Sequence, residues 1–82
     1  MQKKIKLSFP VTSEGVEINT LALRRPKARD LKKMEKAGGG DITKSIDLIA
    51  DLAEQSPATI EDLDAADFQK VSEVVAGFLA KA

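Results

Sequence analysis

Apolar and polar residues alternate with a period of two at the start of the chain. Ile5, Leu7 and Phe9 are separated by single polar residues, and the alternation ends at Pro10. This period is typical of a strand with one buried face, and proline is tolerated at a strand end or edge. We therefore expect a strand up to Pro10, with its apolar side chains on a common core.

A second apolar segment changes face partway along its length. Val16 and Ile18 share one parity, whereas Leu21 and Leu23 share the other. A strand that keeps all four side chains on one face needs an extra residue between the two pairs, so we expect a bulge at residues 19–20. Turn-forming residues precede this segment, and the two strands together predict a β-hairpin.

The rest of the chain shows the helical period, with apolar residues three and four positions apart. Glycine, proline and capping residues divide it into segments. We expect one small α+β domain over 1–82, in which an N-terminal β-hairpin (3–23) is followed by three to four short helices (about 27–37, 42–55, 57–63 and 65–80). An isolated hairpin is marginal in water, so the strands must pack on these helices or on another chain.

The first helix should begin near Pro26, because a proline in the first turn loses no hydrogen bond. Asp30 near this end favours the helix dipole, and we expect it to pair with Arg24 at the end of the strand. Three apolar residues at three-residue spacing predict a narrow core stripe: Ala28, Leu31 and Met34. The helix should run to Ala37.

Three glycines, Gly38, Gly39 and Gly40, follow this helix. One glycine is enough for a left-handed cap, so three predict a flexible joint as well. Glycine before a helix is also how many phosphate sites are built. We expect Asp41 to cap the next helix instead, because its carboxylate takes the same N–H groups and repels phosphate.

The later helices have clear starting signals and broad apolar faces. Ser56 followed by Pro57 predicts a cap and a first-turn proline, and Asp64 with Asp67 resembles a capping box. Both long helices have apolar arcs wider than one packing surface needs, which indicates either a core that uses every apolar residue or a groove for a partner helix. The candidate groove residues are Ile46, Ile49, Leu52, Val71, Val75 and Phe78.

Composition argues against catalysis and against a bound cofactor or metal. The chain has no Cys, His, Tyr or Trp. Acid–base chemistry would therefore fall on carboxylates and lysines, which capping and solubility already explain. Asp62, Asp64 and Asp67 do not follow a calcium-loop spacing. No apolar run reaches the length of a membrane span, and we expect a soluble cytoplasmic protein.

Charge is distributed unevenly along a chain whose net charge is zero. Residues 1–40 carry ten Lys or Arg and four Asp or Glu, a balance of +6, and residues 41–82 carry three and nine, a balance of −6. Such asymmetry favours contact between the halves or head-to-tail association of copies. The basic segment 24–36 leaves open an alternative function as a small nucleic-acid-binding or regulatory module.

The order of several motifs resembles that of a known protein family. The segment 21–40 reads LALRRPKARDLKKMEKAGGG, a Leu-x-Leu-Arg-x-Pro-x-x-x-Asp-Leu pattern followed by a glycine stop. Residues that fit it are Leu21, Leu23, Arg24, Pro26, Asp30, Leu31, Glu35, Lys36, Ala37, Gly38 and Gly39; later ones are Leu63, Asp64, Asp67, Phe68, Val75, Gly77, Phe78 and Leu79. The chain in this respect resembles the tail assembly chaperones of contractile-tailed (Mu-like) phages and prophages.

This resemblance implies a non-catalytic assembly factor. Such chaperones bind the tape measure protein in the host cytoplasm, keep it soluble and promote assembly of the tail tube, whose subunit is a further expected partner. They are absent from the mature virion. The resemblance also implies that family members are often made in short and frameshift-extended forms, of which this chain would be the short one.

Overall fold

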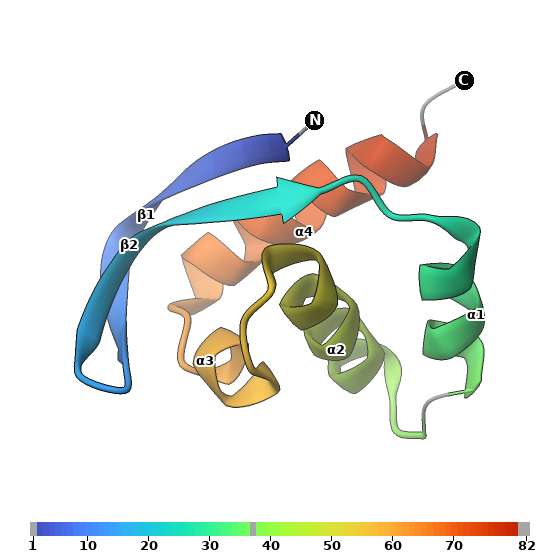
Figure 1. Ribbon diagram of the computed structural model, residues 1–82, viewed down its shortest axis with the longest axis horizontal. Coiled ribbons are helices and arrows are strands. Elements are labelled where there is room, and N and C mark those ends of the chain that lie inside the picture. The colour runs from blue at the N-terminus through green and yellow to red at the C-terminus, as the bar shows by residue number, and fades with distance from the viewer. Residues whose placement is uncertain (1, 37, 81–82) are drawn as a thin grey trace.

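The computed structural model describes residues 2–36 and 38–80 and confirms the expected α+β fold, in which an N-terminal antiparallel hairpin is followed by helices (Figure 1). The elements are β1 (Gln2–Ser13), β2 (Val16–Arg24), α1 (Ala28–Lys36), α2 (Asp41–Ala53), α3 (Pro57–Glu61) and α4 (Ala65–Ala80). The predicted end of the first helix at Ala37 lies outside the described residues. None of the described helices is long and apolar enough to cross a membrane.

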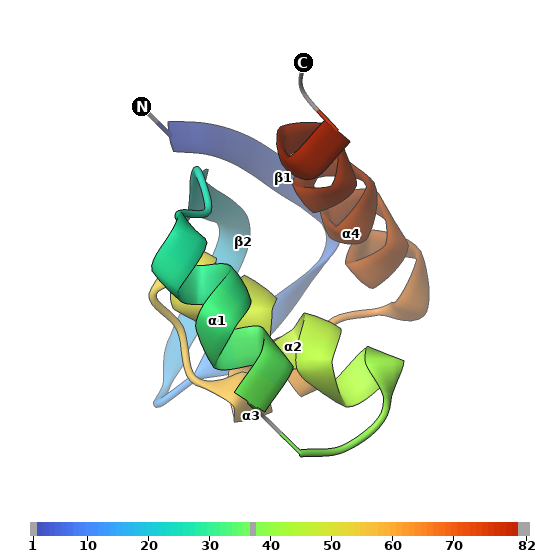
Figure 2. The same cartoon turned by 90° about the vertical axis from the view of Figure 1, so that its right-hand side faces the viewer.

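The hairpin curves over the helices and closes a single apolar core. β2 packs on α2, while β1 packs on α4 and α3, and α2 lies between α1 and α3 (Figures 1 and 2). The core contains apolar residues from both strands, from α2, α3 and α4 and from the connection before α4: Ile5, Leu7, Val11, Leu21, Leu23, Leu48, Ile49, Ala50, Leu52, Ala53, Ile60, Leu63, Val71 and Val75. The strands therefore gain their stability from the helices that follow them.

The hairpin contains a bulge at the predicted level, but on the other strand. Lys6 pairs with Thr20 and Val11 pairs with Ile18, so four residues of β1 (7–10) lie opposite Asn19 alone. The change of face in β2 is therefore accommodated by extra residues in β1, and the prediction of a bulge within the second strand was wrong. The bulge also includes the proline that ends the sequence alternation, which has no N–H to donate to a ladder.

A buried carboxylate from α4 satisfies the backbone of this bulge. Asp67 is fully buried and accepts hydrogen bonds from the backbone N–H groups of Ser8 (3.0 Å) and Phe9 (2.9 Å). The expected capping box is therefore wrong for Asp67, whose side chain bonds to β1. Asp64 does cap α4, because its carboxylate accepts from the N–H of Ala66 at 3.0 Å.

The other helix starts follow the sequence signals to different degrees. Ser56 caps α3 by accepting from the N–H of Thr59, as predicted, with Pro57 in the first turn. Gly40 is the N-cap of α2, without a side-chain hydrogen bond, so the predicted cap Asp41 is instead the first helical residue. Pro26 lies outside α1, which begins at Ala28, so its predicted place in the first turn was wrong.

The predicted core stripe of the first helix is also wrong. Leu31 is 41% exposed and Ala28 is exposed, and only Met34 packs against the core. The buried residue of α1 is instead Asp30, which turns toward the end of β2 to bind Arg24. The rotation of α1 is thus set by an ion pair, and Ala28 and Leu31 are left at the surface.

Candidate partner-binding groove

The six residues that the sequence indicated as groove liners lie in two environments. Four of them are core residues of the folded chain: Ile49, Leu52, Val71 and Val75. Only Ile46 and Phe78 are partly exposed. Ile49 and Val75 meet at a small cavity of about 50 Å³ between α2 and α4, whereas Phe78 lies at a different cavity, so in this conformation the six side chains do not form one groove. An apolar arc on a helix does not reveal which side a strand will cover.

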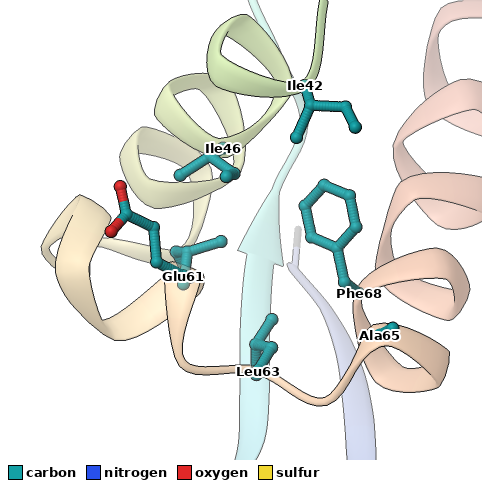
Figure 3. Close-up of a pocket in the computed structure, with 7 residues that line it drawn as sticks. Ile42, Ile46, Glu61, Leu63, Ala65 and Phe68 are labelled. Atoms are coloured by element: carbon teal, nitrogen blue, oxygen red, sulfur yellow. The ribbon is translucent and has the colours of Figure 1, made fainter.

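A different apolar groove lies between the first turns of α2 and α4, with α3 as its third wall (Figure 3). Its volume is about 220 Å³. Its residues are Ile42, Ile46, Ile60, Glu61, Leu63, Ala65 and Phe68, and we call this site the Ile42 groove. Ile42 is 68% exposed, the largest exposed fraction among the large apolar side chains of the described residues. In Figure 3, the Phe68 ring lies between Ile42 and Leu63.

Local sequence explains how the Ile42 groove is built. Ile42 and Ile46 are four residues apart, so they lie on one face of α2, one turn above the other. Ile42 is in the first turn and is 68% exposed, whereas Ile49, two turns later, is buried in the core. The buried Leu63 holds the connection between α3 and α4, which brings Phe68 opposite Ile46. The sequence indicated Ile46 as a groove residue, but not that the first turn of α2 would be uncovered.

The groove lies in the acidic part of the molecule. Residues 41–70, which include the whole lining, contain eight Asp or Glu and two Lys. Of these acids, Glu61 is in the groove lining, and Asp62 and Asp64 are exposed in the adjoining connection. The carboxylate of Glu61 points away from Phe68 (Figure 3). An apolar centre with a negative rim suits an amphipathic segment that carries positive charges beside its apolar residues.

Phe78, the remaining candidate, lies in a separate apolar site near the N-terminus of the chain. The guanidinium of Arg25 stands 5.4 Å from the centroid of its ring, and an Nη of Arg25 donates to the carbonyl oxygen of Phe78 at 3.4 Å. A cavity of about 140 Å³ there is lined by these two residues with Gln2 and Lys3. The cation covers the ring face, so Phe78 is less available than Ile42.

Arg24 and Asp30 form the expected ion pair, with two parallel hydrogen bonds of 2.8 and 2.9 Å. Asp30 also accepts from the backbone N–H of Lys27 at 2.7 Å, which caps the start of α1. The hydrogen bonds from Arg24 lower the pKa of Asp30 well below its usual range and raise that of Arg24. These residues hold a strand end to a helix, which is a structural role.

The three glycines differ in what their backbone requires. Gly39 has φ +99°, and a Cβ there would lie 2.9 Å from Cγ2 of Thr43. Gly38 has no neighbouring atoms within 4 Å of such a Cβ, and neither has Gly40. Only the middle residue of the three therefore needs to be glycine on steric grounds.

The basic segment 24–36 is partly engaged within the chain. Arg24 is bound to Asp30, and Lys33 contacts Asp51 of α2 at 3.0 Å. The remaining cations are exposed: Arg25, Lys27, Arg29, Lys32 and Lys36. Among residues 2–36 and 38–80 there is no group of three His, Cys, Asp or Glu side chains that could hold a metal ion.

Comparison with known proteins gives one result. The family model described as "Phage tail assembly chaperone proteins, E, or 41 or 14" matches residues 4–80. No curated protein and no solved structure matches the chain. The match runs from β1 to the end of α4, so it includes the ion pair, the glycines and the Ile42 groove. The chain therefore belongs to the family of phage tail assembly chaperones.

Proposed function

We propose that this chain binds the tape measure protein of its phage or prophage and keeps it soluble while the tail tube assembles. It acts in the host cytoplasm, without catalysis, and leaves before the virion is complete. The tail tube protein is its second partner. The family match supports a role in tail assembly, and the Ile42 groove is the observation that carries the choice of partner surface.

The groove supports binding of a helix more than binding of a small molecule. Pockets for small molecules usually enclose about 300–1,000 Å³, whereas this one has about 220 Å³ and an exposed isoleucine at its edge. A helix presents apolar side chains at i, i+3 or i+4 and i+7, and two or three of them fit between Ile42, Phe68 and Leu63. The remaining face of that helix stays in water.

Co-expression with the tape measure protein of the same gene cluster tests the function. We expect a soluble complex with several copies of this chain, measured by size-exclusion chromatography with light scattering. Ile42→Asp should abolish the complex without unfolding the chain, because Ile42 is 68% exposed. Val16→Asp is the matched control, since Val16 is 64% exposed at the hairpin tip.

Two results would count against the proposal. If both proteins are folded and soluble but no complex forms, the tape measure protein is not the partner. If Ile42→Asp binds as well as the unmodified chain, the partner surface lies elsewhere. Circular dichroism of both variants shows whether the fold is retained.

A further inference from the structure

We propose that in the free chaperone the Ile42 groove is covered by α1 of a second copy, so that copies associate head to tail. The groove is apolar at its centre and acidic at its rim. Helix α1 has the opposite charge and an uncovered leucine. The occupant of the groove before the partner arrives is thus another molecule of the same chain.

The exposed side of α1 has the chemistry that the groove requires. Leu31 is 41% exposed beside the exposed Ala28, so the two form a small apolar strip. Lys32 and Lys36 are exposed next to it, and Glu35, four residues after Leu31, is exposed on the same face as the strip. A leucine with lysines at its side is the kind of ligand that an apolar groove with an acidic rim accepts.

Charges within one copy do not neutralise this helix. Among the described residues, Lys33 with Asp51 is the one ion pair that joins α1 to the acidic half of the chain. The other cations of α1, which are Arg29, Lys32 and Lys36, are exposed. When α1 of one copy meets the groove of another, the positive charge of α1 lies against the acidic rim. This attraction steers the encounter and fixes its direction.

The two surfaces are different and lie apart on the molecule. α2 separates α1 from α3, the helix that supplies Ile60 and Glu61 to the groove (Figure 1). A contact between unlike surfaces leaves one free α1 and one free groove in every pair. Such heterologous association continues into a ring or an open filament, unlike a two-fold dimer. That a tape measure segment later displaces α1 from the groove rests on the proposed function. The association of copies does not rest on it.

Sedimentation velocity of the purified chain tests the association. We expect the average mass to rise with concentration and to fall when salt is raised from about 0.05 to about 0.5 M, because the rim charges are screened. Leu31→Asp and Ile42→Asp should each give monomers. The first variant lacks the leucine that enters the groove, and the second lacks a groove that can accept it. Val16→Asp should associate like the unmodified chain.

Mixing the two monomeric variants gives the decisive result. The Ile42→Asp chain still has a normal α1 and the Leu31→Asp chain still has a normal groove, so the mixture should form a one-to-one heterodimer and stop there. A mixture that stays monomeric, or an unmodified chain that is monomeric at every concentration, would overturn the proposal. No tape measure protein is present, so this result is independent of the proposed function.

Discussion

Arg24 and Asp30 join the end of β2 to the first turn of α1 through two parallel hydrogen bonds. A guanidinium fork matches a carboxylate in this way, whereas an ammonium makes a single contact. Asp30 is 6% exposed and also holds the N–H of Lys27, so its removal leaves several donors without an acceptor. The pair therefore sets the direction in which the chain leaves the hairpin.

We expect Asp30→Ala to lower the free energy of unfolding by about 2 kcal/mol, because Arg24 and the Lys27 N–H lose a charged acceptor. Arg24→Lys should cost about 1 kcal/mol, since it keeps the charge but not the paired geometry. Urea denaturation measures both. Glu35→Ala, on the exposed side of the same helix, is the control and should change little. Equal stability of Asp30→Ala and Glu35→Ala would contradict this role.

Asp67 gives a second prediction, because its carboxylate is the acceptor for the bulge of β1. Asp67→Asn has nearly the same shape but places an amide group opposite one of two N–H donors. We expect it to cost about 2 kcal/mol of unfolding free energy. Hydrogen exchange should also become faster at the Ser8 and Phe9 amides in particular. A general loss of stability would instead speed up exchange throughout the chain. Asp62→Asn, an exposed residue nearby, should leave both amides protected.

Stability should fall in acid because of the same two carboxylates. Hydrogen bonds from Arg24 lower the pKa of Asp30, and backbone hydrogen bonds from Ser8 and Phe9 lower the pKa of Asp67. A carboxyl group whose folded pKa is depressed contributes stability that is complete above its unfolded pKa, about 3.9, and is lost as pH falls toward the folded value.

The unfolding free energy should therefore be flat near neutral pH and decrease below about pH 4. Urea denaturation at a series of pH values measures this slope. In a chain that carries both Asp30→Asn and Asp67→Asn, stability is lower at neutral pH and the acid slope is shallower. An unchanged slope would show that other carboxylates control acid unfolding.

Gly39 gives the fourth prediction. Gly39→Ala forces an L residue into φ +99° and places its Cβ 2.9 Å from Thr43, so we expect a loss of about 1–2 kcal/mol. Gly38→Ala meets no neighbouring atom and should be neutral or slightly stabilising, because alanine restricts the unfolded chain. Thermal unfolding of the pair compares the two directly. Similar losses in both variants would mean that the whole joint must be free to bend.

Features that depend on neighbouring residues were accessible from the sequence. The spacing of apolar residues along the chain predicts the hairpin and the helices. The serine followed by proline predicts the cap at Ser56. Arg24 and Asp30 are six residues apart, on either side of the connection between β2 and α1. In each case, the atoms that decide the structure are encoded within a few positions of one another.

Features that depend on distant contacts were not accessible. Asp67 looks like a capping residue because the strand that it binds is 58 and 59 residues away along the chain. Leu31 looks like a core residue because its spacing from Ala28 and Met34 predicts a common face, but not which face of α1 the rest of the chain covers. Ile49 and Val75 became candidates for a groove because a helix periodicity gives the width of an apolar arc, but not the element that covers it.

The hydrogen bonds from Ser8 and Phe9 to Asp67 also govern when the protein can finish folding during its synthesis. At about 5–20 residues per second, the ribosome makes Asp67 roughly 3–12 s after these strand residues. Until then the bulge has no acceptor, and β1 lacks α4, one of the two helices on which it packs. The nascent chain must therefore be translated into α4 before its N-terminal strands acquire their final register, so a product that stops before α4 cannot hold the native hairpin.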